Sequence, residues 1–89
     1  MAVIIKISGE KENIEPLNGK LFSLSELQKA VGGYIQIVPI NSGEYTGKLM
    51  IVDEEGKWKA NAQINEEASE IANQMIVGQV MIIDKNQIE

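Results

Sequence analysis

The sequence predicts an α+β fold: a mixed, mainly antiparallel sheet of four to six strands, with two helices packed on one face. Several short runs rich in Val and Ile are bounded by Gly, Asn and Pro, which is typical of strands. Two further segments repeat apolar residues at helical spacing and begin at Ser23 and Asn65, residue types that favour the N-cap. The elements follow one another as β-β-α-β-β-(β)-α-β, where the parentheses mark a segment that fits a strand or a loop.

The first part of the chain is expected to supply two strands. Ala2–Ser8 is an almost continuous β-branched run, which indicates a strand inside the sheet. Gly9–Asn13 is polar and is expected to form a loop. Asn13–Leu17 is predicted as a short second strand, which its proline confines to an edge. A turn is expected at Asn18-Gly19.

The first helix is predicted from a capping box. In Ser23-Leu24-Ser25-Glu26, the Ser23 hydroxyl can accept from the Glu26 amide while the Glu26 carboxylate accepts from the Ser23 amide. Gly32 and Gly33 are expected to end the helix through a left-handed C-cap. An apolar stripe at helical spacing lies between these signals: Leu24, Leu27, Ala30 and Val31.

The middle of the chain is expected to supply further strands. Tyr34–Ile40 is predicted as an internal strand that ends at its proline, and Lys48–Val52 as the next strand. A turn with Gly56 at positive φ is expected to follow. Lys57–Ile64 carries apolar residues at alternate positions, so it fits a ragged third strand as well as a loop.

The second helix and the last strand close the chain. Asn65 is the expected N-cap, and Glu66 and Glu67 lie in the first turn, where the helix dipole favours negative charge. Val80–Ile83 is the expected last strand, followed by a polar tail, Asp84–Glu89. The helix is expected to bury five apolar residues: Ala68, Ile71, Ala72, Met75 and Ile76.

The composition restricts the chemistry that this chain can perform. Its 89 residues include no His, Cys or Arg, and the charged groups are 8 lysines and 13 carboxylates, with a net charge of −5. The side chains that most readily move protons, bind soft metals or clamp phosphates are therefore missing. We expect a non-enzyme without a cofactor, located in the cytoplasm, that contacts neither a membrane nor a nucleic-acid backbone. Residues 1–89 form one expected domain, whose small core favours a homo-oligomer.

Two acidic clusters and a glycine pair have both a functional and a structural interpretation. Asp53–Lys57 groups three carboxylates, and Glu66, Glu67 and Glu70 form a second cluster. A hard cation or acid–base chemistry would use such groups, but solvated turns and helix ends contain them routinely, and we favour the latter. Gly32-Gly33 could form an anion-binding nest, but helix termination explains the pair better.

Trp58 is the most informative aromatic residue because it stands between Lys57 and Lys59. An exposed indole beside lysines could stack on a base or anchor a partner. Alternatively, Trp58 covers one edge of the core. The sequence leaves both readings open.

Four sequence segments together resemble a small family of domains of unknown function encoded by phages, prophages and plasmids. They occur in one order along the chain: VGGYIQIVPI (31–40), IVDEEGK (51–57), INEEASEIA (64–72) and IVGQVMII (76–83). Many relatives carry a proline-rich stretch before the second-helix asparagine, where this chain has KANAQ (59–63). The resemblance implies a phage accessory protein and no established activity.

The leading hypothesis is a non-catalytic phage binding protein that counters host defence by sequestering a small nucleotide signal. Its ligand-binding residues are expected to be Tyr34, Lys57, Trp58, Lys59, Asn61 and Asn65, with no catalytic or metal-ligating residue. One alternative is an acidic interaction module that inhibits a host enzyme, which Glu54, Glu55, Glu66, Glu67 and Glu70 would carry. A carboxylate–metal enzyme is a further alternative.

Overall fold

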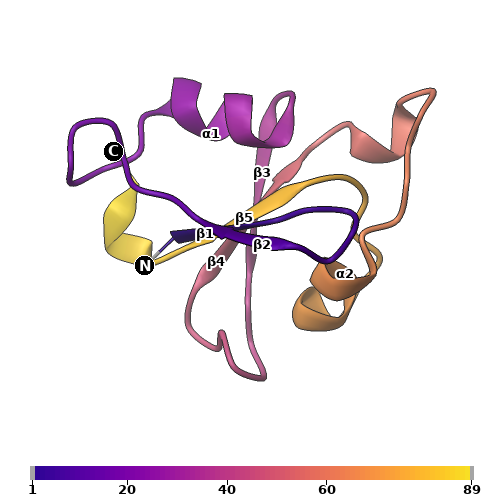
Figure 1. Ribbon diagram of the computed structural model, residues 1–89. Helices are drawn as coiled ribbons and strands as arrows, with labels where there is room; N and C mark the ends of the chain where they lie inside the picture. Colours follow the sequence, from indigo (N-terminus) through magenta and orange to yellow (C-terminus); the bar gives the residue numbers. More distant parts are fainter. Residues whose placement is uncertain (1, 89) are drawn as a thin grey trace.

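The computed structural model describes residues 2–88, and its five strands form a single sheet in the order β2-β1-β5-β4-β3 (Figure 1). Each neighbouring pair of these strands is antiparallel. The predicted α+β class and the order of its main elements are confirmed. The elements are β1 (Ala2–Ile5), β2 (Lys11–Asn13), α1 (Leu24–Val31), β3 (Ile35–Pro39), β4 (Leu49–Asp53), α2 (Glu66–Ala72) and β5 (Val80–Ile83), with 3-10 turns η1 (Gly56–Trp58) and η2 (Lys85–Gln87).

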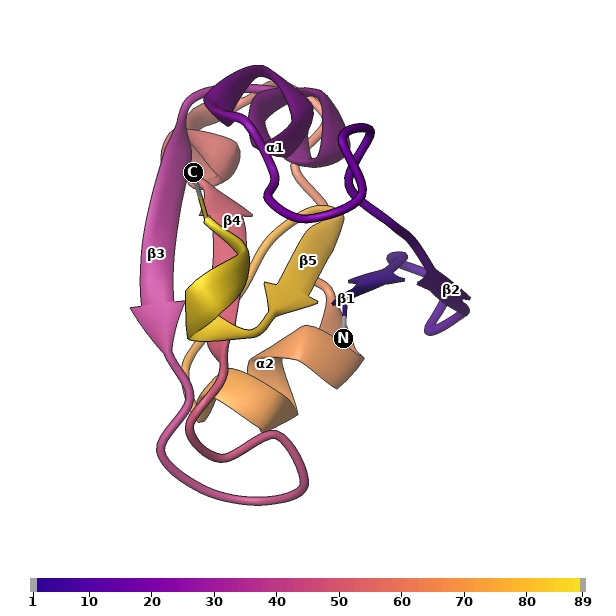
Figure 2. The same cartoon turned by 90° about the vertical axis from the view of Figure 1, so that its left-hand side faces the viewer.

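The two helices pack on opposite faces of the sheet, so the expectation that both lie on one face is wrong. Figure 2 shows α1 and α2 on opposite sides of β5. Ala2 and Ile4 of β1 face the cluster that contains Leu27 of α1, whereas Val3 and Ile5 face the cluster of α2. The continuous Val and Ile runs of β1 and β5 reflect this arrangement, because strands buried on both faces do not alternate with polar residues.

The edge strands also differ from the expectation. β2 forms at Lys11–Asn13 and not at Asn13–Leu17, because the turn after β1 closes early, with the Lys6 N–H donating to Glu10 O at 2.9 Å. β3 was expected inside the sheet but is the second edge. Its Val38 is buried while Ile37 is exposed, so only one side of this strand is fully covered.

The segment 57–64 is a loop with one 3-10 turn and not a strand. Within this segment, the one strand-like contact is an isolated antiparallel bridge between Ile64 and Val77. Gly56 does not take the expected positive φ. Its backbone is instead buried, and a Cβ at this position would lie 3.3 Å from Val77 O.

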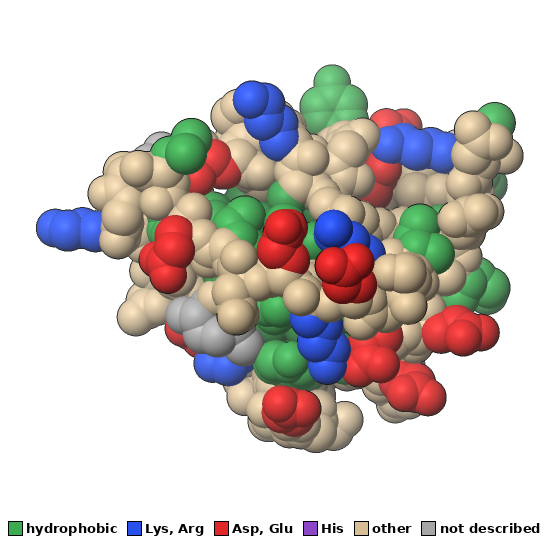
Figure 3. Space-filling view, viewed as in Figure 1, with side chains coloured by type: hydrophobic (Ala, Val, Ile, Leu, Met, Phe, Trp, Pro, Cys, Tyr) green, Lys and Arg blue, Asp and Glu red, His purple; other side chains and the backbone are tan. Residues whose placement is uncertain are grey.

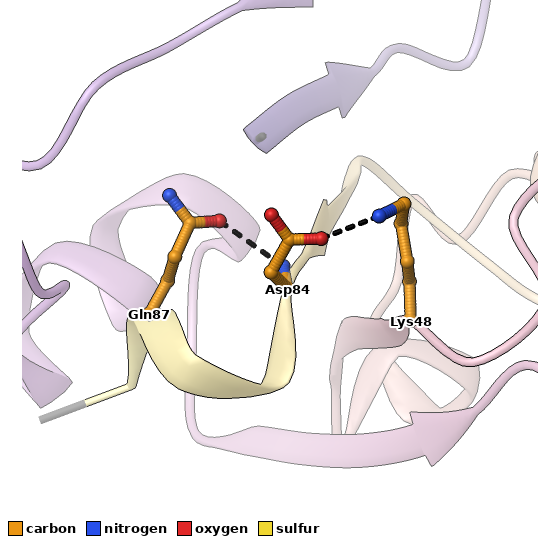
Figure 4. Close-up of polar contacts among 3 residues, drawn as sticks. All are labelled: Lys48, Asp84 and Gln87. Carbon is orange, nitrogen blue, oxygen red and sulfur yellow. Dashed lines mark hydrogen bonds and ion pairs between the residues drawn. The ribbon is translucent and has the colours of Figure 1, made fainter.

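The second helix is shorter than expected. α2 ends where Asn73 adopts a left-handed conformation, so Met75 lies beyond the helix and is exposed. Within the predicted polar tail, residues 84–88 include η2, which begins with a capping box, and Lys48 Nζ lies 2.5 Å from Asp84 Oδ1 (Figure 4). No helix within residues 2–88 has the length and apolarity needed to cross a bilayer.

Candidate functional site

The exposed aromatic and lysine side chains gather where the loop after β4 meets the start of β3. Trp58 is 85% exposed and Tyr34 is 66% exposed. Lys57 and Asn61 are also exposed on this loop. Trp58 therefore does not cover the core, and this part of the molecule offers apolar and polar groups to a ligand.

Lys59 holds the loop against the C-terminal end of α1. Its ammonium donates to Gly32 O at 2.8 Å and forms an ion pair with the carboxylate of Asp53. That carboxylate is only 5% exposed and also accepts from the Glu55 N–H at 2.9 Å. Because its charge is already paired, Lys59 positions the loop and offers little to a ligand phosphate.

Gly33 provides space for this ion pair. A Cβ at Gly33 would lie 2.9 Å from an Asp53 carboxylate oxygen, a distance that real Cβ atoms do not show. Gly32 has a φ of 84° and ends α1 as expected. The pair Gly32-Gly33 thus ends a helix and admits a buried carboxylate, which corrects the expectation that Asp53 is a solvated turn residue.

Three small cavities surround the loop. One of about 130 Å³ lies on the α2 side of the sheet, with Gln36, Val38, Trp58 and Met75 among its walls. A second of about 280 Å³ lies under the loop. A third of about 370 Å³ is bordered by Tyr34 and Lys59. Pockets for small molecules usually measure roughly 300–1,000 Å³, so the first two cavities fall below this range and the third lies at its lower end.

Asn65 lies inside the molecule, so its expected role in ligand binding is wrong. It is fully buried, and its Oδ1 accepts from the Ala68 N–H at 3.0 Å. Its Nδ2 donates to Ile5 O at 3.1 Å and to Gly78 O at 2.9 Å. With its acceptor and both donors engaged, Asn65 fixes the start of α2 to β1 and to the loop before β5.

Four of the six expected binding residues are exposed: Tyr34, Lys57, Trp58 and Asn61. Lys57 and Trp58 line the same cavity, whereas Asn61 and Tyr34 each line one of the other two. Sequence reasoning missed the apolar walls at Val38, Met75 and Val77. It had assigned Met75 to the buried face of the second helix. The signal that could have corrected this is Asn73, a residue type that often takes the left-handed conformation that ends a helix.

The acidic side chains do not form one continuous site. Glu54 and Glu55 belong to the turn after β4, whereas Glu66, Glu67 and Glu70 lie on α2, where Glu67 Oε2 is 3.4 Å from Lys11 Nζ. Figure 3 shows carboxylates around α2 with lysines among them. Within residues 2–88, no group of three or more Asp and Glu side chains is arranged to hold a metal ion.

Comparison with known proteins identifies the family. The model of a family described as "Domain of unknown function (DUF3846)" matches residues 1–89, so the chain belongs to this family. No curated protein and no solved structure matches the chain. The expected membership of a family of domains of unknown function is therefore confirmed.

Proposed function

We propose that this DUF3846 member is a non-catalytic binding protein that holds a small nucleotide against Trp58. The observation that supports this most directly is the 85% exposure of the indole beside one cavity wall. A base stacked on an exposed aromatic ring gains about 1–3 kcal/mol. The indole packs little in the single chain, and the exposed Met75 lines the same cavity, so the two side chains form a grouped apolar surface of the kind that marks interaction sites.

Lys57 supplies the charge for a phosphate. It follows Gly56 in η1, lines the same cavity as Trp58, and no ion pair or hydrogen bond engages its ammonium within residues 2–88. Charge-assisted hydrogen bonds from an ammonium to phosphate are roughly twice as strong as neutral ones. Asn61 and Tyr34 add amide and hydroxyl groups on the adjoining cavities.

The biological role within this proposal follows from the resemblance to proteins of phages, prophages and plasmids. A phage accessory protein in the cytoplasm of an infected bacterium would counter host defence by lowering the concentration of a nucleotide signal. Sequestration needs only binding, which suits a chain without His, Cys or Arg.

Fluorescence of the single tryptophan tests the proposal directly. Titration with cyclic dinucleotides and with nucleoside monophosphates should quench Trp58 emission as the base stacks. Lys57→Met should weaken the response about tenfold, whereas Lys20→Met, which changes an exposed lysine on the turn at Gly19, should leave it unchanged. Native mass spectrometry that finds only apo protein and free nucleotide would contradict sequestration.

A second candidate function, an acidic module that inhibits a host enzyme, is favoured by one observation. Glu66 and Glu70 are exposed one turn apart on α2, and Glu44, Glu67 and Glu70 line a shallow cavity of about 210 Å³. An interface built on these charges should weaken steeply between about 50 and 300 mM salt. Partner binding that does not respond to salt would exclude this alternative.

A further inference from the structure

The two edges of the sheet are built differently. β2 is three residues long, fully exposed and carries Lys11 and Glu12, features that discourage pairing with another strand. β3 has five residues and no charged side chain. Figure 2 shows β3 at the outside of the sheet with no element beside its free side. Only its proline protects this edge.

The hydrogen-bonding groups that β3 presents outward follow from its register with β4. Tyr34 O accepts from the Glu54 N–H, and the Ile40 N–H donates to Lys48 O, so even-numbered residues bond toward β4. The N–H and C=O groups of Ile35 and Ile37 therefore point away from the sheet. Pro39 also lies on this side, where it offers a C=O group but no N–H.

We infer that a second copy of this chain pairs antiparallel with β3, about a two-fold axis at Gln36. This register places Ile35 of one copy opposite Ile37 of the other. Each of the two pairs exchanges both N–H···O bonds, so the outward donors and acceptors of Ile35 and Ile37 are all satisfied. A shift that centres the axis on Ile35 or Ile37 leaves some of these groups without a partner.

The hydrogen-bond ladder between the two copies also ends where no further N–H group is free to donate. Beyond Ile37, Pro39 faces Gly33 of the second copy, whose N–H already donates to Gln28 O at 3.2 Å. The register therefore pairs every outward N–H group of β3, and the C=O of the exposed Pro39 is left to solvent. Pairing β3 with β2 of another molecule would instead be heterologous and leave open ends.

The side chains of β3 and the charge of the chain also favour a second copy as the partner. Ile37, which is 44% exposed, would lie beside Ile35 of the second copy, and Val38 beside its Tyr34. Each chain has a net charge of −5, so two copies approach most easily along an edge without charged side chains. Burial of apolar area also compensates for the small core of an 89-residue chain.

The pairing has a consequence for the candidate site. Val38 and Gln36 line the cavity beside Trp58, and Tyr34 of the second copy lies opposite Val38 on the same face. The second copy thus adds an aromatic side chain to a cavity of about 130 Å³. The strand pairing does not depend on the proposed nucleotide, and only this sharing of the cavity rests on the proposed function.

Sedimentation tests the interface without any ligand. Between about 10 μM and 1 mM, the mass of the chain should rise from 9.8 kDa toward twice that value. Ile37→Lys should weaken self-association about tenfold or more, whereas Ile7→Lys, at a site 42% exposed, should not. A chain that stays monomeric, or a dimer that Ile37→Lys leaves unchanged, would overturn the inference.

Cross-linking tests the register, because the sequence contains no cysteine. Residues directly opposite in a non-hydrogen-bonded pair have Cα atoms about 4.5 Å apart, within the range of about 4.4–6.8 Å that disulfides need. Gln36→Cys should therefore form a disulfide-linked dimer on mild oxidation. Ile37→Cys should not, since its two copies are diagonal neighbours roughly 7–8 Å apart. The reverse result would exclude the axis at Gln36.

Discussion

The two helices begin with the same type of hydrogen bond in different surroundings. At α1, Ser23 Oγ accepts from the Glu26 N–H at 3.2 Å, and Glu26 Oε1 accepts from the Ser23 N–H at 3.0 Å. At α2, Asn65 Oδ1 accepts from the Ala68 N–H, while its Nδ2 donates to β1 and to the loop before β5. The hydrogen bonds of the first cap join residues three to nine positions apart, whereas the second cap joins parts of the chain up to 60 residues apart.

This difference separates the local role of a cap from a role in the tertiary structure. A local cap satisfies amides that water could also reach, so its loss costs only part of a hydrogen bond. A buried cap that also donates to two carbonyl groups leaves them without a partner when it is removed, and buried polar groups without partners are costly. Asn65 should therefore contribute more to stability than Ser23 and Glu26.

The largest effect is expected from Asn65→Ala. This substitution removes the cap of α2 and the donors to Ile5 O and Gly78 O. It should lower the free energy of unfolding by about 2–4 kcal/mol, measured by urea titration. Asn61→Ala, which changes an exposed asparagine in the same loop, should alter it by less than about 0.5 kcal/mol.

Asn65→Asp separates the two roles of this side chain. It keeps an oxygen that can cap α2 but removes both donors and places a charge in the interior. We expect it to be at least as unstable as Asn65→Ala at pH 7. Stability close to that of the unchanged chain would show that the cap alone matters and that the comparison fails.

Lys59→Met should have the next largest effect, because the C-terminal end of α1 depends on a distant residue. The substitution keeps an apolar stem but removes the ammonium from Gly32 O and from the buried Asp53 carboxylate. Since Lys59 is half-exposed, we expect a loss of about 1–2 kcal/mol in urea titration, at the lower end of the cost of an unpaired buried group. The matched Lys57→Met should change stability by less than about 0.5 kcal/mol. Equal effects at both lysines would contradict the role of Lys59 as a tether.

Ser23→Ala should have a smaller effect that stays local. The Glu26 N–H loses its side-chain acceptor, but Glu26 Oε2 still accepts from the Leu17 N–H at 2.8 Å. We expect a loss of about 1 kcal/mol in the free energy of unfolding. Hydrogen exchange should show faster opening at the first turn of α1 and unchanged protection in β5. Loss of protection in β5 would mean that this cap also supports the tertiary structure.

The same contrast explains which features the sequence predicts. The capping box, the left-handed Gly32 and the cap at Asn65 depend on residues a few positions apart, and all are confirmed. The burial of Asp53, its pairing with Lys59 and the placement of the helices on opposite faces depend on distant contacts, and these were missed. The spacing of residues along the chain does not show which distant residues will contact each other.

For the candidate site, the sequence drew attention to Trp58 and its neighbours but left open whether the indole is exposed, which the structure shows it is. It could not show that only one of the two flanking lysines is unpaired. Nor could it show that β3 is an edge, because a run of Ile and Val reads the same at the edge as inside a sheet. Which strand lies at the edge depends on the order of the strands in the sheet, and the turn residues in the sequence do not specify that order.

The smallest expected effect is the part of the pH dependence of stability that comes from the local cap of α1. Backbone N–H groups of Ser23 and Leu17 donate to the Glu26 carboxylate and hold its pKa below the ordinary value of 4.5. The unfolded chain therefore binds this proton at higher pH than the folded chain. The stabilisation is fully present above about pH 4.5 and is lost as pH falls through the lower folded pKa.

Glu26→Gln should remove this part of the acid sensitivity, because the amide oxygen still accepts hydrogen bonds but does not titrate. Urea titrations at several pH values below 4.5 should show a shallower decline in stability than in the unchanged chain. Asp84, whose pKa is lowered chiefly by its hydrogen bond with Lys48, titrates with the same sign. Asp84→Asn should therefore flatten the decline independently, and the two effects should add, since the groups lie in separate hydrogen-bond networks. A decline unchanged by Glu26→Gln would mean that the hydrogen bonds to the Glu26 carboxylate contribute no proton-linked stability.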